Sequence, residues 1–421
     1  MIKNLRDALG KKEVVVEAWI QDYRSSGKIT FLILRDLYDV YQGVVKNKKI
    51  DLSQESFVRI KGYLKDAVLK SNELTIKDKE LVVEEIEIVS PADPLPIPVV
   101  EKGVNTGLDK RLDYRYLDIR KPSVRAIFRI ESTIINSFRR FFYDKGFIEI
   151  QPPGIIATST EGGTDLFPIK YFEKKAFLAQ SPQLYKQLGA ISLGRVFSTS
   201  PVWRAEKHNT TRHLNEIRQL DIEVAMADDM EVMKLLEECI QFIVRSVKKE
   251  NKEDLELLGI NLVVPKAVYL SYDGAIKELN NAGYSISHGE DLDPGAERKL
   301  AELYPDSIIF VHSWPIELKP FYIWPKDKNK GISAGFDALL NGLEISSGGQ
   351  RIHRPEVLIE VLKEKGLNPE NFKWYIDAFR YGAPPHSGWS IGLERITMAL
   401  LRLENIREVA LFPRDRHRLT P

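Results

Sequence analysis

Residues 388–395 read Gly-Trp-Ser-Ile-Gly-Leu-Glu-Arg, a pattern that predicts a strand turning through glycine into a helix. Two earlier segments have a similar mixture of apolar, charged and turn-forming residues. Residues 145–153, Lys-Gly-Phe-Ile-Glu-Ile-Gln-Pro-Pro, predict a helix end and then a strand that closes on proline. Residues 203–206, Trp-Arg-Ala-Glu, precede a mostly polar stretch and then Glu216 and Ile217. Taken singly, each segment is more often an ordinary turn or a surface ion pair than a functional site.

In this order the three segments resemble motifs 1, 2 and 3 of class II aminoacyl-tRNA synthetases. Motif 1 lies near residues 145–153, motif 2 near 203–217 and motif 3 near 388–400. The sequence has no GxxxxGK[ST] loop and no GxGxxG after a predicted strand, so neither of those nucleotide-binding loops is expected. The resemblance implies an α+β catalytic domain in which an antiparallel sheet is flanked by helices.

Connecting segments narrow the resemblance to one subgroup. Residues 108–118, 160–164, 180–186 and 344–351 are similar to aspartyl-tRNA synthetases, and the long insertion of the bacterial enzymes is missing. The similarity is therefore to the archaeal and eukaryotic type. It implies ATP-dependent activation of L-aspartate to aspartyl-adenylate and transfer to the 3′ end of tRNA(Asp). Whether tRNA(Asn) is a second substrate is left open by the resemblance.

The first ninety residues predict a separate small domain. Runs rich in Val and Ile, separated by turn signals, predict strands at residues 13–23, 28–36, 39–46, 57–65 and 73–89. About five strands favour a small closed barrel, and an OB-fold is the natural candidate for residues 1–90. The proline-dense residues 91–98 begin a linker or hinge that we place at 91–122. By the resemblance, the barrel binds the anticodon.

The remaining residues, 123–421, predict a mixed catalytic domain. Apolar residues at helical spacing predict a helix that ends at Gly146, and two more helices are expected near 230–249 and 355–366. Strands are expected at residues 147–150, 176–180, 195–206, 217–227, 308–312 and 342–346. These groups do not alternate regularly, which favours an α+β domain around an antiparallel sheet.

Composition excludes several other classes of protein. Lys plus Arg total 61 against 60 for Asp plus Glu, so the chain is not a polycation that binds nucleic acid by bulk charge. Its single cysteine, Cys239, excludes an internal disulfide and suits a reducing compartment. No apolar run approaches the ~18 residues of a membrane span, and no secretory signal follows Met1. We therefore expect a cytoplasmic enzyme that does not enter a membrane.

The chemistry of adenylate formation gives roles to the motif residues. When a carboxylate attacks the α-phosphate of ATP, negative charge builds up, so fixed cations and a metal are needed and no protein nucleophile is. The resemblance assigns Arg204 to the α-phosphate and the substrate carboxylate, and Arg395 to the γ-phosphate side and adenine. Asp337, Glu344 and Ser347 would hold Mg²⁺ through hard oxygen ligands. Further ATP contacts are expected from Glu206, Arg212, His213, Glu216, Ile217 and Glu344.

Two motif positions depart from the usual pattern. Ile217 stands where an aromatic residue commonly stacks on adenine, so one face of the base would meet an aliphatic chain. Ser390 replaces a usual glycine, and we expect little consequence because serine is small.

The choice of amino acid depends on Lys186. The resemblance places Lys186 and Arg351 against the substrate side chain, beside Ser181 and Gln183. Two cations suit a β-carboxylate, whereas asparagine would leave a buried cation unpaired. Glu161, on a glycine-bearing loop that can close as a lid, would bind the α-ammonium. The alternative interpretation of Lys186 is an ordinary exposed lysine on a helix.

Other functions share parts of this pattern. Asparaginyl- and lysyl-tRNA synthetases have the same architecture, although asparaginyl enzymes typically lack the lysine. A non-catalytic paralogue would be expected to have lost Arg204, Glu344 or Arg395, and all three are present. An amidating ligase usually lacks the anticodon domain. A simple nucleic-acid-binding barrel explains only residues 1–90.

Two kinds of partner follow from the resemblance. In the barrel, Phe31 would stack on the middle anticodon base, Gln42 would read a base edge, and Gln21 falls where tRNA(Asp) and tRNA(Asn) are distinguished. Gln21 can donate and accept, so we predict that both tRNAs are charged. The alternative for Phe31 is a core phenylalanine. The motif 1 segment ending at Pro153 would form the interface of a homodimer.

Overall fold

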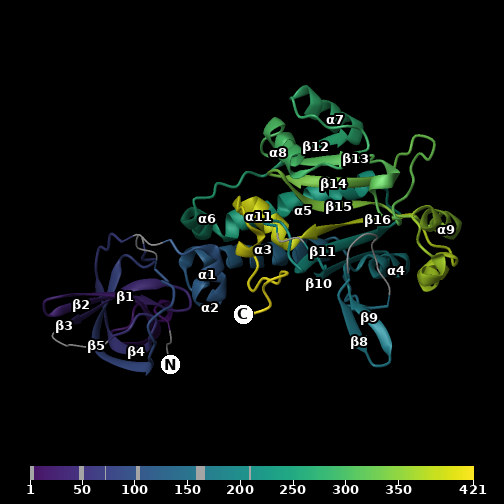
Figure 1. Cartoon of the computed structure of the whole chain (residues 1–421). Helices are drawn as coiled ribbons and strands as arrows, with labels where there is room; N and C mark the ends of the chain where they lie inside the picture. The colour runs from purple at the N-terminus through teal and green to yellow at the C-terminus, as the bar shows by residue number, and fades with distance from the viewer. Residues whose placement is uncertain (1–3, 47–51, 72, 101–104, 158–165, 208–209) are drawn as a thin grey trace. The chain divides into compact units, whose positions relative to one another are not determined.

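The computed structural model describes residues 4–46, 52–71, 73–100, 105–157, 166–207 and 210–421 (Figure 1). The described chain divides into two compact units, Met1–Lys121 and Pro122–Pro421. Each unit has its own hydrophobic core, so each is described by itself.

The smaller unit contains a closed barrel. Its described strands are β1 (Val14–Ser26), β2 (Ile29–Arg35), β3 (Val40–Lys46), β4 (Phe57–Asp66) and β5 (Lys79–Ser90). They are joined in the order β1-β2-β3-β5-β4, and β1 closes the barrel on β4. Alternate residues of β1 point inward and are buried, as the pleat of a strand requires. The barrel predicted from the sequence is confirmed.

Part of the last predicted strand was wrong. Residues 73–78 do not extend β5 but form a turn, in which the Thr75 amide donates to the carbonyl oxygen of Val40. Further along, Gly62 on β4 passes so close to the Val82 carbonyl that a side chain at this position would collide with the backbone of β5. Glycine is therefore required at this irregularity in the pairing of β4 with β5.

The segment after the barrel is only partly extended. No helix or strand is present in residues 91–100, but α1 (Leu108–Asp113) and α2 (Arg115–Asp118) follow within the predicted linker. Asp118 is buried and accepts hydrogen bonds from Arg111 at 2.9 Å and from Arg115 at 2.6 Å. Glu55 of the barrel unit pairs with Arg120 at 2.9 Å, so charged contacts fix both ends of this helical segment.

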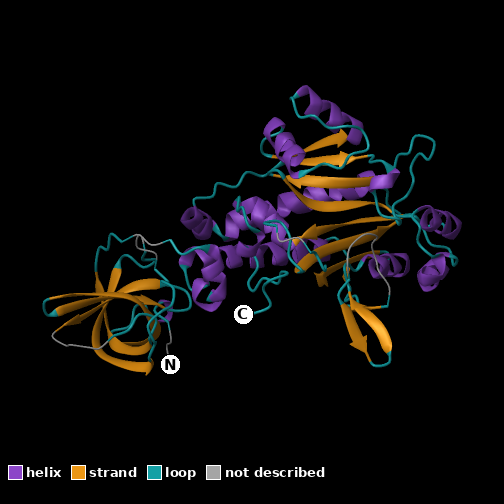
Figure 2. Ribbon diagram, viewed as in Figure 1, coloured by secondary structure: helices purple, strands orange, loops and turns teal. Residues whose placement is uncertain are grey.

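The larger unit is built on a sheet of eight strands among the described residues (Figure 2). Their order is β12 (Lys266–Ser271), β13 (Ser307–His312), β14 (Gly335–Leu340), β15 (Leu343–Gln350), β16 (His386–Gly392), β11 (Glu216–Ala225), β10 (Arg195–Trp203) and β6 (Ile148–Glu149). All neighbours are antiparallel except β12–β13 and β10–β6. The predicted antiparallel sheet is confirmed. A small second sheet contains β7 (Ile155–Ile156), β9 (Lys174–Leu178) and β8 (Pro168–Tyr171).

Helices cover the large sheet. The long helices α3 (Pro122–Asp144) and α5 (Asp229–Glu250) pack on each other and, with α11 (Leu393–Leu401), bury their apolar faces in one core with the central strands. α5 begins with a capping box between Asp228 and Glu231. The other described helices are α4 (Gln183–Leu193), α6 (Lys252–Leu258), α7 (Tyr272–Asn281), α8 (Pro294–Leu303), α9 (Pro355–Glu364) and α10 (Lys373–Phe379). Short 3₁₀ turns lie at Arg6–Ala8, Ile316–Leu318, Pro369–Phe372 and Ile406–Glu408.

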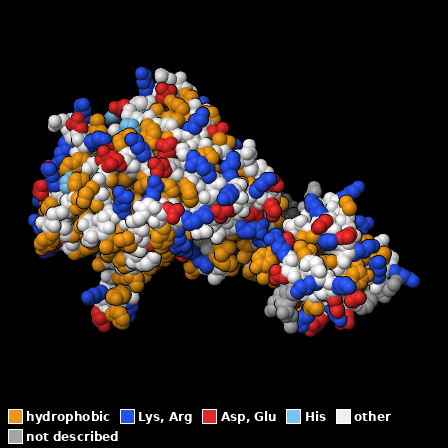
Figure 3. Space-filling model, turned by 180° about the vertical axis from the view of Figure 1, so that it is seen from behind, with side chains coloured by type: hydrophobic (Ala, Val, Ile, Leu, Met, Phe, Trp, Pro, Cys, Tyr) orange, Lys and Arg blue, Asp and Glu red, His pale blue; other side chains and the backbone are white. Residues whose placement is uncertain are grey.

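The mixed charges on the surface agree with the nearly neutral net charge, and the lengths of the helices agree with the lack of a long apolar run in the sequence. Figure 3 shows Lys, Arg, Asp and Glu side chains mixed over one face of the larger unit, without a wide area of one sign. Within the described residues, no helix is both long enough and apolar enough to cross a membrane. Cys239 is buried in the main core, as predicted from the apolar helix that contains it.

Candidate active site

A cavity of about 260 Å³ lies on the central strands of the large sheet. Neighbouring strands β11, β15 and β16 supply one wall, the start of α4 supplies another, and residues 319–323 close a third side. The structure brings eight predicted residues together around it: Ser181, Gln183, Arg204, Ile217, Glu344, Ser347, Arg351 and Arg395. Ser390, which replaces the motif glycine, also lines the cavity.

Lys186 lies behind this cavity instead of lining it. Only 2% of its surface is exposed, so the alternative of an ordinary exposed lysine is wrong. Its ammonium donates to Asp221 Oδ1 at 2.9 Å and to the Trp389 carbonyl oxygen at 3.1 Å, and lies 3.6 Å from Glu223 Oε2. The charge of Lys186 therefore already has carboxylate partners.

Arg351 forms the second cation of this buried cluster and does line the cavity. Its guanidinium donates to both carboxylate oxygens of Glu223, at 2.9 and 3.3 Å. The guanidinium also lies over the ring of Tyr322, 5.5 Å from its centre. Burial opposes the charge of Arg351, but Glu223 outweighs it and raises the pKa of the guanidinium. Arg351 is thus a fixed positive charge at the cavity wall.

Gln219 and Asp221 are among the cavity residues that were missed by the sequence reasoning. Both are buried, and Gln219 Oε1 and Asp221 Oδ2 have no hydrogen-bond partner among the described residues. Burial raises the pKa of Asp221, and the neighbouring Lys186 opposes that effect. A signal for them was present: residues 217, 219, 221 and 223 alternate along β11 and so face one side of the sheet.

The two motif arginines come from different elements. Arg204 follows the last residue of β10, where its amide donates to the carbonyl oxygen of Asn215 at 2.9 Å. Arg395 lies on the first turn of α11 and donates to the Glu344 carbonyl oxygen at 3.2 Å. The neighbouring Glu394 is buried and accepts the Arg218 amide of β11 at 3.1 Å, which holds motif 3 against motif 2.

Carboxylates gather beside Arg395. Asp337 on β14 faces Ser347 on β15, and a bulge at Ile345 brings Glu344 to the same cavity wall as Ser347. Burial and the nearby Asp337 raise the pKa of Glu344 to about 7. Lys319, another residue missed from the sequence, donates to Asp337 at 2.5 Å and lies over the ring of Trp314.

This group of oxygen ligands fits a divalent cation. Asp337 raises the pKa of Glu344, so a positive charge between the two carboxylates would stabilise them, and hard oxygen atoms suit Mg²⁺. The described residues contain no cluster of three or more His, Cys, Asp and Glu with the geometry of a metal site. Asp337, Glu344 and Ser347 could together offer two carboxylates and a hydroxyl, which would leave the other ligand positions to oxygen atoms of a substrate.

The other predicted ATP residues lie outside the cavity lining. Arg212 pairs with Glu297 of α8 at 2.6 Å, and His213 Nδ1 lies 2.6 Å from the hydroxyl of Thr210. Burial, followed by the charge of Arg395, lowers the pKa of His213. Glu206 is half-buried and Glu216 is exposed at the start of β11.

One predicted substrate residue cannot be placed. Glu161 and its glycine-bearing loop lie outside the described residues. The predicted interface residue Pro153 is exposed at the end of the motif 1 segment.

The barrel contains the three predicted anticodon residues. Phe31 on β2 is 37% exposed, so the alternative of a core phenylalanine is wrong. Gln42 on β3 donates to Glu80 of β5 at 3.0 Å. Gln21 lies at a bulge in β1 and is buried, and within the described residues its Oε1 has no partner.

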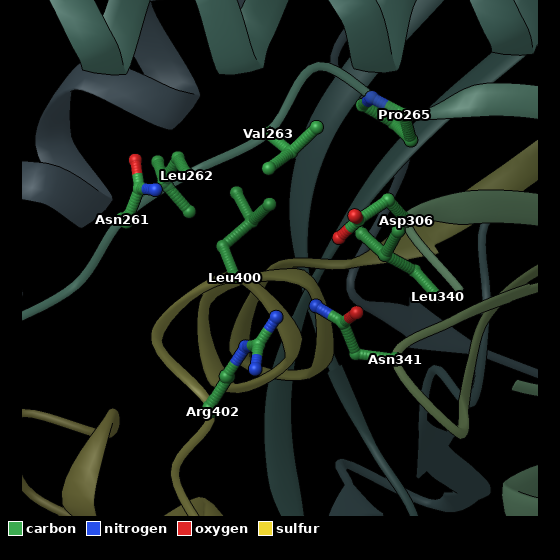
Figure 4. A pocket seen from close by; sticks show the side chains of 9 residues that line it. All are labelled: Asn261, Leu262, Val263, Pro265, Asp306, Leu340, Asn341, Leu400 and Arg402. Atoms are coloured by element: carbon green, nitrogen blue, oxygen red, sulfur yellow. The ribbon is translucent and has the colours of Figure 1, made fainter. Parts of the chain in front are cut away.

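A second hollow in the larger unit is too small for these substrates. Figure 4 shows Leu262, Val263 and Leu400 beside Asp306 and Arg402 around it. Its volume is about 20 Å³, which is enough for about one water molecule. The cavity on the central strands is therefore the candidate active site.

Comparison with known families agrees with the fold. A family model described as "tRNA synthetases class II (D, K and N)" matches residues 107–416, and one described as "OB-fold nucleic acid binding domain" matches residues 14–89. The first match covers most of the chain, so the chain belongs to the class II tRNA synthetases of the D, K and N group.

Individual relatives give the finer similarity. The chain is 45% identical to the aspartate–tRNA(Asp/Asn) ligase of Methanocaldococcus jannaschii, over 99% of this chain and 97% of the relative. It is also 45% identical to the aspartate–tRNA(Asp) ligase of Pyrococcus furiosus, over 99% and 98%. Among solved structures, asparaginyl-tRNA synthetase from Pyrococcus horikoshii with asparaginyl-adenylate has a TM-score of 0.91 and 32% identity, covering 97% of this chain and 96% of that one. The aspartyl-tRNA synthetase of Entamoeba histolytica has a TM-score of 0.89 and 33% identity, covering 100% and 93%.

Proposed function

We propose that this chain is an aspartate–tRNA ligase, which activates L-aspartate with ATP and transfers it to the 3′ end of tRNA(Asp). The observation that carries the proposal is a buried pair of cations, Arg351 at the cavity wall and Lys186 behind it, which share a contact with Glu223. Relatives similar over the full length are named as aspartate–tRNA ligases, which supports the same substrate.

The cavity offers complementary groups for the whole amino acid. The β-carboxylate of aspartate would meet the guanidinium of Arg351, with Lys186 behind it. The α-ammonium would meet the acceptor atoms of Gln219 and Asp221, whose oxygens lack partners among the described residues. Gln183 and Ser181 line the same cavity from the start of α4, and Glu161 is proposed to complete the ammonium site.

Adenylate formation follows from this placement. The α-carboxylate of aspartate attacks the α-phosphate of ATP and pyrophosphate leaves, so the substrate itself supplies the nucleophile. Arg204 would hold the α-carboxylate and the α-phosphate together, which makes the reaction effectively intramolecular. Arg395 would stabilise the departing phosphates and cover one face of adenine, with Ile217 on the other side. The terminal adenosine of the tRNA then attacks the adenylate carbonyl and AMP leaves.

The remaining ATP contacts belong to the polar side chains around the cavity mouth. Glu206 and Glu216 would bind adenine and ribose, and Arg212 and His213 would meet the outgoing pyrophosphate. Arg212 must first leave Glu297, its partner at 2.6 Å. Asp337, Glu344 and Ser347 would hold Mg²⁺, which supplies positive charge against the phosphates when bound.

ATP–pyrophosphate exchange tests the choice of amino acid directly. We expect exchange with aspartate, and exchange with asparagine or lysine that is at least about a hundredfold weaker, because the guanidinium of Arg351 binds a carboxylate more strongly than an amide or an ammonium group. Equal or greater exchange with asparagine would refute the proposal.

Asparaginyl-tRNA ligase is the second candidate. The high TM-score with an asparaginyl enzyme favours it, because the scaffold is shared. Against it stands the guanidinium of Arg351 at the cavity wall, a positive charge that suits the β-carboxylate of aspartate better than an uncharged amide. The same exchange experiment separates the two candidates.

The barrel is proposed to read the anticodon. Phe31 offers an exposed ring on which a base can stack, and Gln42 on the adjacent strand offers an amide for a base edge. Gln21 is buried on β1, the strand that pairs with β2, and has a free acceptor among the described residues, so we propose that it tolerates both third anticodon bases. The enzyme would then charge tRNA(Asp) and also tRNA(Asn).

The motif 1 segment is proposed to form a homodimer interface. Ile148 and Ile155, on either side of Pro153, are each nearly half exposed although apolar. Large exposed apolar side chains close together in sequence suit a surface that a second chain covers. We place the enzyme in the cytoplasm, where tRNA is charged.

A further inference from the structure

A buried hydrogen-bonded chain of side chains runs from the cavity into the protein behind α4. Gln183 donates through Nε2 to Gln187 Oε1 at 2.9 Å, one turn further along the helix. Tyr375 of α10 donates to the same oxygen at 2.8 Å. Gln187 Nε2 lies 2.9 Å from His386 Nε2, and His386 Nδ1 lies 2.9 Å from the Pro384 carbonyl oxygen. All of these side chains are buried.

Which group donates and which accepts in every hydrogen bond of this series of side chains follows from one atom. The carbonyl oxygen of Pro384 can only accept, so Nδ1 of His386 carries a proton. In neutral His386, Nε2 is then an acceptor, and Gln187 must turn its NH₂ group toward it. The oxygen of Gln187 therefore faces Tyr375 and Gln183. Gln183 in turn must offer its NH₂ group to Gln187, which leaves its own oxygen toward the cavity.

We propose that His386 is a positioning residue that, through Gln187, turns the oxygen of Gln183 toward the substrate's α-ammonium. This inference rests on the proposed function, because the ammonium belongs to the aspartate placed there. It assigns roles to His386 and Gln187, neither of which touches the substrate. The amide of Gln183 would otherwise present either end, and its NH₂ end would repel the ammonium.

Protonation of His386 would exchange the donors and acceptors in this series of hydrogen bonds. With both ring nitrogens protonated, Nε2 becomes a donor and Gln187 must turn its oxygen toward the ring. Gln187 then offers NH₂ to Gln183, and Gln183 rotates so that its own NH₂ group faces the cavity. A single proton thus changes the group that meets the ammonium.

The surroundings keep His386 neutral at ordinary pH. Burial lowers the pKa of His386, and Arg351 and His353 lower it further, while Glu223 and the Pro384 carbonyl oppose them. The ring stacks on Phe379 with an interplanar angle of 8°. The Tyr375 hydroxyl stays protonated because burial raises its pKa, so it remains a donor.

Two substitutions of Gln187 test the relay. Gln187→Leu removes it, and we expect the KM for aspartate in ATP–pyrophosphate exchange to rise about tenfold, the loss expected for one hydrogen bond to a charged group. The KM for ATP should change less than twofold. Gln187→Glu keeps an acceptor toward Gln183 and Tyr375, so its KM for aspartate should stay within about twofold of the parent's.

The two variants should also differ in their pH dependence. In the parent, the KM for aspartate should rise only when the pH falls well below the usual histidine range, because burial lowers the pKa at which His386 becomes protonated. In Gln187→Glu this rise should be absent, because the carboxylate accepts from Gln183 whatever the state of His386. Equal KM values for parent and Gln187→Leu, or an unchanged acid rise in Gln187→Glu, would overturn the proposal.

A measurement on the parent keeps the test independent of how the variants fold. The ¹⁵N shifts of histidine-labelled protein at pH 7.5 report the tautomer of each ring, and the His386 signal is the one that moves in Gln187→Glu. We expect a protonated Nδ1 and an unprotonated Nε2, and the opposite tautomer would refute the relay. If the parent shows no aspartate-dependent exchange at all, the proposed function fails, whereas an active parent with the wrong tautomer refutes only the relay.

Discussion

The ammonium of Lys186 lies among Asp221, Glu223 and the carbonyl oxygen of Trp389, so its removal affects both binding and folding. We expect Lys186→Leu to reduce aspartate-dependent exchange about a hundredfold or more while the KM for ATP changes little. Because two buried carboxylates lose their partner, the free energy of unfolding should also fall, by about 3–5 kcal/mol.

The matched control for this substitution is Lys170→Leu, at an exposed position on β8. Both variants are compared in exchange and in urea unfolding. Lys186 has no part in recognising aspartate if the Lys186→Leu enzyme exchanges as well as the control.

Glu394 gives a prediction for the dependence of stability on pH. Burial raises the pKa of Glu394 to about 7, above that of a carboxyl in the unfolded chain. The protonated carboxyl therefore favours the folded state at low pH, and this contribution is lost as the pH rises through 7. The rise of this pKa from 4.5 to about 7 corresponds to about 3 kcal/mol. Between pH 5 and pH 8, the free energy of unfolding of Glu394→Gln should therefore rise by about 3 kcal/mol relative to that of the parent.

Urea unfolding at the two pH values measures the difference. Glu404→Gln, at an exposed position one turn beyond α11, is the control and should show no such change. A parent and a Glu394→Gln protein with the same pH dependence would contradict the assignment.

Individual residues show which parts of the candidate site could be predicted from the sequence and which could not. Arg204, Arg351 and Arg395 could be placed at one site because their motifs are local patterns of strand ends and turns. The carboxylate partners of the buried cations could not be predicted, because Glu223 lies 128 residues from Arg351 and no local pattern links them. Arg212 likewise meets Glu297, 85 residues away.

At the scale of elements, the bulge in β15 brings the predicted metal ligands to one wall. Without the extra residue Ile345, Glu344 and Ser347 would face opposite sides of the sheet. We expect Glu344→Gln to abolish adenylate formation at ordinary Mg²⁺ concentrations while the protein melts like its parent. Asp66→Asn, at an exposed position in the barrel, should leave the exchange rate unchanged. If Glu344→Gln turns over normally, the metal site lies elsewhere.

Prediction of elements succeeded where one face is apolar and failed where strands are short or central. The period of apolar residues predicted α3, α5 and α9 to within a few residues. β14 was missed because its six residues are buried on both faces, so its sequence does not alternate. The helices α7 and α8 were missed as well, although Ser271 and Asp293 are recognisable N-caps.

At the scale of the molecule, the barrel should affect tRNA charging and leave adenylation unchanged. We expect Phe31→Ala to reduce aminoacylation of tRNA(Asp) about tenfold or more, since stacking of one base contributes about 1–3 kcal/mol. ATP–pyrophosphate exchange should not change. Tyr63→Ala, which removes another exposed aromatic ring of the barrel, is the control.

Transcripts of tRNA(Asp) and tRNA(Asn) are compared in the same aminoacylation assay. We predict that tRNA(Asp) and tRNA(Asn) are charged at rates within about tenfold. Discrimination of a hundredfold or more, roughly two hydrogen bonds, would refute the relaxed role of Gln21, and full activity of Phe31→Ala would refute stacking.

Assembly is tested by mass. Light scattering at micromolar concentration should give twice the 48.2 kDa of one chain. Ile148→Asp should lower this mass to that of a monomer, because a charge would be buried in the interface. Tyr381→Asp, at another strongly exposed site, should leave it unchanged. A monomeric parent would contradict the dimer.

The neutral cluster of Lys186, Arg351, Asp221 and Glu223 also constrains how this enzyme could be redesigned or could evolve. Exchanging Lys186 alone to admit an uncharged substrate would strand a carboxylate in the interior, so the first step on that route is the most costly one. A lineage that changes its amino acid must alter a cation and a carboxylate together, or pass through a poorly folded intermediate. Because of the charge balance beneath the cavity, a single mutation that would change the amino acid attached at the aspartate codons also destabilises the enzyme.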